Sequence, residues 1–273
     1  MLSRRTMLSQ LTLLGAGVAA AATAPGLIGK ANAAEPTRLW TGFSSPVGMA
    51  FDRAGHLFVA EWGAGRISRI APDGARTTFA DSLSGPSGLA IDADGSIYVA
   101  SYSRDEVYRF TPAGERETAI TGLATPAGLG FDRSGRLLVA NRRTNEILAF
   151  DKAGTRNVAA SGLRTPVGAV QRPDGGFIVS NIGGGITILR GDGRRIETGE
   201  ALRTPGPGIA QTESGRVFVV DYGGTAIHEV FDDGRTALFA DGLSSPVGLA
   251  VSASGDLFAA DWGNGAVYRI ALA

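Results

Sequence analysis

The chain has 273 residues, with 26 basic and 26 acidic side chains and no cysteine. This charge balance gives no support for nucleic-acid binding by long-range electrostatics. The lack of cysteine excludes disulfides, thiol catalysis and lipid attachment through a cysteine.

The first 33 residues have the pattern of an export signal. Ser3–Leu8 contains the paired arginines of a twin-arginine signature, an apolar stretch runs from Leu11 to Ala22, and Ala31–Ala33 is an A-x-A cleavage site. We expect residues 1–33 to be a twin-arginine signal peptide and residues 34–273 to be periplasmic or secreted, with no stable membrane anchor. The alternative is an uncleaved anchor, which the short, Gly- and Ala-rich stretch disfavours. Removing these 33 of the 273 residues takes away three basic side chains and no acidic one, so 240 residues with a net charge of −3 remain.

A 40-residue period governs the rest of the chain. The period is seen in the series Pro46, Pro86, Pro126, Pro166 and Pro246, in Gly48, Gly88, Gly128, Gly168, Gly208 and Gly248, and in Gly55, Gly95, Gly135, Gly175, Gly215 and Gly255. Six copies of one unit are therefore present. A fixed period in this range indicates a repeat architecture, in which no unit buries its hydrophobic face alone.

Each unit is expected to form four strands, as its second copy illustrates. The predicted strands are Ser87–Asp92, Ser96–Ala100, Glu106–Phe110 and Glu115–Ile120, here called a, b, c and d. Short β-branched and aromatic runs bounded by Gly, Pro and Asp are typical of strands joined by tight turns. Four strands repeated six times predict an all-β fold, a six-bladed β-propeller with four antiparallel strands per blade that counts as one domain.

The two ends of the repeat region complement each other. The sixth copy stops at Ala273 after its strand c, whereas Pro36–Trp40 matches a strand d that precedes the first copy. We therefore expect the N-terminal strand to complete the last blade. This pairing covers strand edges that would otherwise favour aggregation.

The repeat resembles a known family. Pro86–Ser101 (PSGLAIDADGSIYVAS) and Pro46–Trp62 (PVGMAFDRAGHLFVAEW) resemble the NHL repeat, and the resemblance covers residues 34–273. It implies a propeller related in fold to the senescence-marker-protein/gluconolactonase and streptogramin B lyase propellers. Its bearing on function is weak, because NHL-like propellers include scaffolds, RNA binders, lactonases and lyases.

Chain direction places the d–a and b–c loops on one face, called the top face, where propellers of this kind generally bind ligands. Strand b ends there on a polar residue, and the next position is often aromatic. Three adjacent blades offer Glu61-Trp62, Asp221-Tyr222 and Asp261-Trp262, and Arg142, with Arg104 and Arg143, forms a basic sector opposite them. Aromatic faces beside carboxylates suit a cationic ligand or a sugar. We predict a ligand-binding site formed by Glu61, Trp62, Asp221, Tyr222, Asp261, Trp262 and Arg142.

A structural role is the alternative for the carboxylates, since Asp and Asn side chains commonly accept hydrogen bonds from turn backbone. Nor do we expect the carboxylates to share a metal ion. Neighbouring blades hold the backbones of Glu61 and Asp261 about 10 Å or more apart, whereas calcium needs oxygen ligands at about 2.4 Å.

The active-site residues of enzyme families with related propellers have no counterpart at the matching positions of this sequence. In the gluconolactonase family, acidic and amide residues of the Pro-x-Gly region hold a divalent metal. The matching residues here are Val47, Ser87, Ala127, Val167, Pro207 and Val247. Amidating-lyase propellers bind zinc through several histidines, whereas this chain has two, His56 and His228, and both are expected to be structural. The catalytic histidine of streptogramin B lyases has no match after Glu61. We predict no catalytic residue, no metal and no cofactor.

The repeat breaks at one place. One residue is missing between Asn181 and Gly193, and one is added at Pro205–Gly208; both changes fall in top-face loops. They mark either a functional site or ordinary drift of loop length.

The sequence favours a monomeric binding module whose top face takes a small molecule or a protein partner. The alternative is a gluconolactonase-like hydrolase or lyase with a divergent active site.

Overall fold

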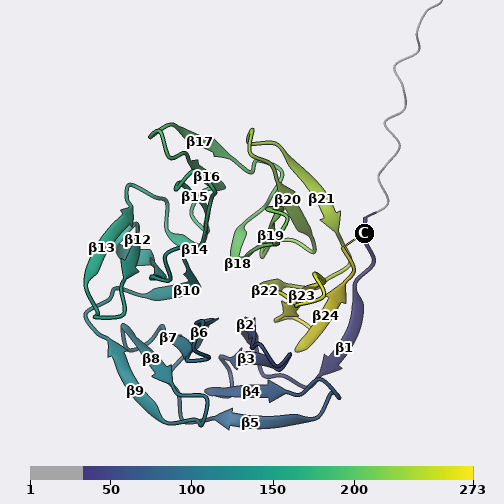
Figure 1. Cartoon of the computed structure of the whole chain (residues 1–273). Coiled ribbons are helices and arrows are strands. Elements are labelled where there is room, and N and C mark those ends of the chain that lie inside the picture. Colours follow the sequence, from purple (N-terminus) through teal and green to yellow (C-terminus); the bar gives the residue numbers. More distant parts are fainter. Residues whose placement is uncertain (1–32, 273) are drawn as a thin grey trace, which may run out of the picture. The chain divides into compact units, whose positions relative to one another are not determined.

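The computed structural model describes residues 33–272, which form six four-stranded antiparallel sheets around a central axis (Figure 1). The predicted six-bladed propeller is thereby confirmed. The expected signal peptide lies outside the described residues except for Ala33. The described residues contain no helix that is long and apolar enough to cross a membrane.

Every blade has the strand order a-b-c-d from the axis outward. The a strands are β2 (Pro46–Phe51), β6 (Pro86–Ile91), β10 (Pro126–Phe131), β14 (Pro166–Gln171), β18 (Pro205–Gln211) and β22 (Pro246–Val251). The b strands are β3 (Leu57–Glu61), β7 (Ile97–Ser101), β11 (Leu137–Asn141), β15 (Phe177–Asn181), β19 (Val217–Asp221) and β23 (Leu257–Asp261). The c strands are β4 (Arg66–Ile70), β8 (Glu106–Phe110), β12 (Glu146–Phe150), β16 (Ile186–Leu189), β20 (Ile227–Val230) and β24 (Ala266–Ile270). The d strands are β5 (Arg76–Ala80), β9 (Arg116–Ile120), β13 (Arg156–Ala160), β17 (Arg195–Thr198), β21 (Thr236–Ala240) and β1 (Thr37–Thr41). Blades are numbered 1 to 6 from β2.

The core lies between the blades. The b strands are buried along their whole length except at Tyr98 of β7, which explains their nearly continuous apolar sequence. Between blades 1 and 2, for example, Phe58 and Ile67 pack against Val99 and Phe110 in one cluster. Each blade therefore depends on its neighbours for burial, as the repeat period predicts.

The last blade closes as expected. Strand β1 pairs antiparallel with β24, with Thr41 opposite Ala266, so the N-terminal strand supplies the missing strand d (Figure 1). Trp40 packs on Phe258 with ring centroids 6.2 Å apart, and Nε of Arg38 donates to the hydroxyl of Tyr268 at 3.0 Å.

The Pro-x-Gly glycines mark the closest approach of the blades at the axis. A β carbon on Gly48 would lie 2.2 Å from the carbonyl oxygen of Ser87 in the next blade, and one on Gly88 would lie 2.2 Å from that of Ala127. The same relation continues around the ring. A side chain at these positions would push the blades apart, which gives the glycine series its physical reason.

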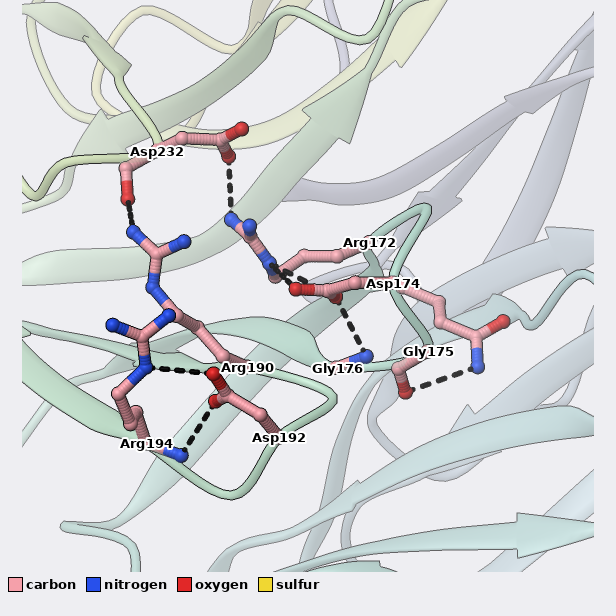
Figure 2. Close-up of polar contacts among 9 residues, drawn as sticks. Arg172, Asp174, Gly175, Gly176, Arg190, Asp192, Arg194 and Asp232 are labelled. Atoms are coloured by element: carbon pink, nitrogen blue, oxygen red, sulfur yellow. Dashed lines mark hydrogen bonds and ion pairs between the residues drawn. The ribbon is translucent and has the colours of Figure 1, made fainter.

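Blades 4 and 5 contain the irregularities that the sequence indicated. Strand β16 has four residues, and β18 has seven because it includes the additional residue of Pro205–Gly208. On the face opposite the top, Arg172 is buried and pairs with Asp174 at 3.2 Å and with Asp232 of blade 5 at 2.5 Å. Figure 2 shows these pairs beside Arg190, whose Nη2 donates to the carbonyl oxygen of Asp232 at 2.6 Å. This cluster ties the two blades together on the face opposite the irregular loops.

Candidate functional site

A cavity of about 220 Å³ opens on the axis among the top-face loops. Two residues from each blade line it, one from the Pro-x-Gly segment and one from the position after strand b. The first set is Val47, Ser87, Ala127, Val167, Pro207 and Val247, and the second is Trp62, Tyr102, Arg142, Ile182, Tyr222 and Trp262. We call this cavity the axial cup. Its lining is mainly apolar and aromatic.

An aromatic arc runs along one side of the axial cup. Trp62 of blade 1 contacts Trp262 of blade 6 with ring centroids 6.3 Å apart, and contacts Tyr102 of blade 2 edge-on at 5.0 Å. The two tryptophans and Tyr102 are half-buried, and Tyr222 is 38% exposed. Three blades thus present a continuous aromatic wall that packing covers only in part.

Arg142 ends this arc on blade 3. Its Nη1 donates to the hydroxyl of Tyr102 at 2.7 Å, and its guanidinium carbon lies 5.4 Å from the centre of that ring. The Nε of Arg142 is buried and has no hydrogen-bond partner among the described residues. Arg142 begins the single 3-10 turn of the described chain, Arg142–Thr144, which Asn145 ends with a positive φ of 58°. That turn holds the arginine at the wall of the axial cup.

Glu61 lies in the interior of blade 1 instead of lining the axial cup. Its carboxylate is fully buried and accepts hydrogen bonds from the Ser44 N–H at 2.7 Å, from Ser68 Oγ at 2.5 Å and from Arg66 Nε at 2.8 Å. Burial alone would raise the pKa of Glu61, but the bonds from Arg66, Ser44 and Ser68 together outweigh it and hold the pKa below its ordinary value. The charge of Glu61 is therefore balanced within the blade.

The other two acidic residues are placed in the same way. Asp221 accepts from the Thr204 N–H at 2.8 Å, and Asp261 accepts from the Ser244 and Ser245 N–H groups at 2.8 and 3.0 Å. Both carboxylates are buried and neither lines the axial cup. The residue that ends strand b thus binds the backbone of the d–a loop that enters its blade. This role is close to the structural role that the sequence analysis gave as the alternative to ligand binding.

The structure therefore brings together Trp62, Tyr222, Trp262 and Arg142, while it places Glu61, Asp221 and Asp261 beneath them. Tyr102 and Ile182 were not among the predicted site residues, although both occupy the position of Trp62 in their own copies of the repeat. The Pro-x-Gly residues were compared with metal ligands alone, whereas they line the axial cup. Because no carboxylate lines the axial cup, the rationale for a cationic ligand does not apply there.

Both histidines lie outside the axial cup. His228 is buried in β20, and desolvation lowers its pKa, although the charges of Asp221 and Asp241 oppose that shift. His56 lies on the opposite face, where Nδ1 contacts Asp52 at 2.8 Å and Nε2 contacts Arg69 Nη2 at 2.7 Å. Within residues 33–272, no three His, Asp or Glu side chains gather as a metal-binding group.

Solved structures share the fold of this chain at low sequence identity. A gluconolactonase from Xanthomonas campestris has a TM-score of 0.77 and 16% identity, with 86% of this chain and 89% of that chain covered. A streptogramin B lyase has a TM-score of 0.66 and 16% identity, with 87% and 97% covered, respectively. A chain of the nidogen/laminin complex has a TM-score of 0.69 and 22% identity, with 78% and 88% covered.

No protein-family model matches the sequence, and no curated protein matches it significantly. The NHL assignment consequently stays a prediction. At these identities the structural similarity establishes the fold alone, so the chain is a six-bladed β-propeller of the architecture that lyases, gluconolactonases and the nidogen/laminin complex share.

Proposed function

We propose that this chain is an exported ligand-binding propeller that captures a planar apolar or aromatic group in its axial cup. The observation that carries the proposal is the half-buried aromatic arc of Trp262, Trp62 and Tyr102 around an open, apolar cavity. Apolar area left in contact with water is costly, and concave aromatic surfaces of this kind commonly receive a ligand. Aromatic rings can supply the main anchors of such a contact.

The chemistry of the lining favours binding over catalysis. The twelve lining residues include no carboxylate and no imidazole, the groups that most often transfer protons in hydrolases and lyases. His56 is engaged on both ring nitrogens, and His228 is buried in the blade. A gluconolactonase-like or lyase-like activity therefore gains no specific support from the axial cup.

The test is to measure binding of a neutral planar probe, 2-naphthamide, to the full-length protein by calorimetry. Wild-type protein should bind the probe, and Trp62→Ala/Trp262→Ala should lose most of that affinity while the native fold is retained. Trp40→Ala is the matched control, because Trp40 packs at the blade closure and should affect stability without changing probe affinity.

Two outcomes would contradict the proposal. One is the absence of probe binding to wild-type protein at millimolar concentration. The other is a large fall in the melting temperature of the double variant, which would show that the two tryptophans hold the blades together.

A further inference from the structure

We infer that the ligand of the axial cup is a small molecule that carries a carboxylate or another anionic group beside its planar ring. This inference rests on the proposed function and names the class of ligand that the cup would select. The arginines of the top-face loops have no role in the aromatic contact proposed above.

Five arginines stand in the top-face loops of four consecutive blades. They are Arg104 and Arg142–Arg143 in the b–c loops of blades 2 and 3, and Arg164 and Arg203 in the d–a loops that enter blades 4 and 5. Within residues 33–272, none of the five forms an ion pair with a carboxylate, whereas Arg136 and Arg269 on the opposite face pair with Asp132 and Asp256, respectively. All except Arg142 are exposed. One sector of the top face is therefore basic although the region of residues 34–273 is expected to be net acidic.

None of the nearby acidic groups lines the axial cup. Glu61 is paired with Arg66, and Asp221 and Asp261 are buried against backbone N–H groups. Asp105 lies in a top-face loop, and its Oδ1 accepts from the Thr125 N–H at 2.6 Å. The carboxylates of Asp105, Asp221 and Asp261 thus accept hydrogen bonds from the loop backbone. The guanidinium groups of the five arginines remain available to a ligand.

Arg142 joins this basic sector to the aromatic arc. It lines the axial cup, and the bond of its Nη1 to Tyr102 fixes the guanidinium beside that ring. An anionic group attached to a planar ring on the arc would accept a charge-assisted hydrogen bond from the remaining N–H groups of Arg142, which is stronger than a neutral one. The partly buried position of Arg142 also reduces screening of this charge by water and salt.

The break in the repeat places a second arginine nearby. A β carbon on Gly184 would lie 2.9 Å from Cδ and 3.3 Å from Nη1 of Arg164, so this side chain lies over the shortened b–c loop of blade 4. The same loop contributes Ile182 to the axial cup. Arg142 and Arg164 therefore occupy neighbouring blades on the side where the aromatic arc ends. Arg164 does not line the axial cup itself, so it would reach a ligand only at the rim.

The volume of the axial cup favours a small molecule over a folded partner. About 220 Å³ is below the usual range of about 300–1,000 Å³ for sites that enclose drug-sized ligands, so the cup suits one ring system and its substituent. A carboxylate on that ring would lie at the rim, within the basic sector.

The experiment compares 2-naphthoate with its neutral isostere 2-naphthamide by calorimetry on the full-length protein. We expect 2-naphthoate to bind about tenfold more tightly, as one charge-assisted hydrogen bond would provide. Arg142→Gln should abolish this preference, so that the ratio of the two affinities falls to about one. Arg133→Gln is the matched control, since Arg133 is exposed in the a–b turn of the same blade on the opposite face; it removes the same charge and should keep the preference.

The outcomes separate this inference from the proposed function. Equal or tighter binding of 2-naphthamide would overturn the anionic ligand but leave the aromatic cup in place. The anionic ligand would also be overturned if both single variants, Arg142→Gln and Arg164→Gln, still bound 2-naphthoate more tightly than 2-naphthamide. Failure of wild-type protein to bind either compound would contradict the proposed function itself.

Discussion

The carbonyl oxygen of Val47 occupies the space next to the α carbon of Gly248, so that a β carbon on this glycine would lie only 1.8 Å from it. Gly248 belongs to blade 6 and Val47 to blade 1, and their contact closes the ring of close approaches at the axis. The two residues are about 200 positions apart in the chain. They are in contact because the first and the sixth blade become neighbours when the ring closes.

The ring of close approaches predicts a sharp difference between two glycines of β10. A β carbon on Gly128 would lie 2.3 Å from the Val167 carbonyl oxygen, whereas one on Gly130 would lie 3.5 Å from the Ala169 carbonyl oxygen, an ordinary contact. Gly128→Ala should therefore lower the free energy of unfolding by about 2 kcal/mol or more through overpacking. Gly130→Ala should be nearly neutral. Urea denaturation of both variants measures the difference, and equal stabilities would contradict the axial-contact explanation.

The closure of blade 6 by β1 predicts that this strand stabilises the whole propeller. Trp40→Ala should lower the free energy of unfolding by about 2–3 kcal/mol, because it removes a large partly buried ring that packs on Phe258. Leu39 is 41% exposed, so Leu39→Ala should change stability by less than about 0.5 kcal/mol. Deletion of residues 35–40 should be more severe than either substitution. Thermal and urea unfolding provide the measurements, and an unchanged melting temperature of the deletion variant would exclude this closure.

The buried carboxylate of Glu61 predicts a loss of stability in acid. Because its pKa is held below the ordinary value, the ionised side chain stabilises the native state above pH of about 4.5, and this contribution is lost as the pH falls through the native pKa. Glu61→Gln should cost about 2 kcal/mol at pH 7, since it removes charge-assisted hydrogen bonds in a buried site. The variant and wild type should converge as the pH falls through the native pKa of Glu61.

Glu117→Gln is the control for Glu61, because the Glu117 side chain is 60% exposed and pairs with a partly exposed Arg109. It should have little effect on stability at either pH. Equal pH profiles for wild type and Glu61→Gln would show that Glu61 does not contribute to the acid dependence.

His228 predicts a second pH dependence, at a higher pH. Burial lowers its pKa in the native state against the opposing charges of Asp221 and Asp241, so the unfolded chain binds the proton first as the pH falls below about 6.5. Native stability from the neutral imidazole is therefore present above this pH and decreases below it. His228→Leu should flatten the stability profile between about pH 7 and 5, and Leu148 already occupies the matching position of blade 3. Measurements at pH 8, where both side chains are neutral, separate the packing effect from the proton effect.

The fold was predictable because each strand pattern is repeated in six copies. The strands expected at Glu106–Phe110 and Ser96–Ala100 are observed at Glu106–Phe110 and Ile97–Ser101, a difference of one residue at most. Turn glycines and buried b strands are local signals, and local signals repeated six times define both the element type and the number of blades. The closure by β1 followed from the same period.

The site was less predictable, because it depends on which way neighbouring side chains point. Glu61 and Trp62 are adjacent, and consecutive side chains at the end of a strand alternate between faces. The sequence shows that both belong to the top-face loops, but not that Ser44, 17 residues earlier, binds the carboxylate. Tyr102 could have been selected from its position in the repeat, whereas its bond to Arg142 joins residues 40 positions apart.

The pairing of β1 with β24 also determines when the molecule can become complete. Arg38 and Tyr268, which are bonded across this pair, are 230 positions apart in the chain. The sixth sheet therefore cannot be completed until β24 has been synthesised, and contacts of such long range are slow to form. A chain that lacked β24 would not be a slightly smaller propeller. Its sixth sheet would keep only β22 and β23, and the edge of β23 and the strand β1 would stay exposed at the stage of folding at which association with other chains is most favoured.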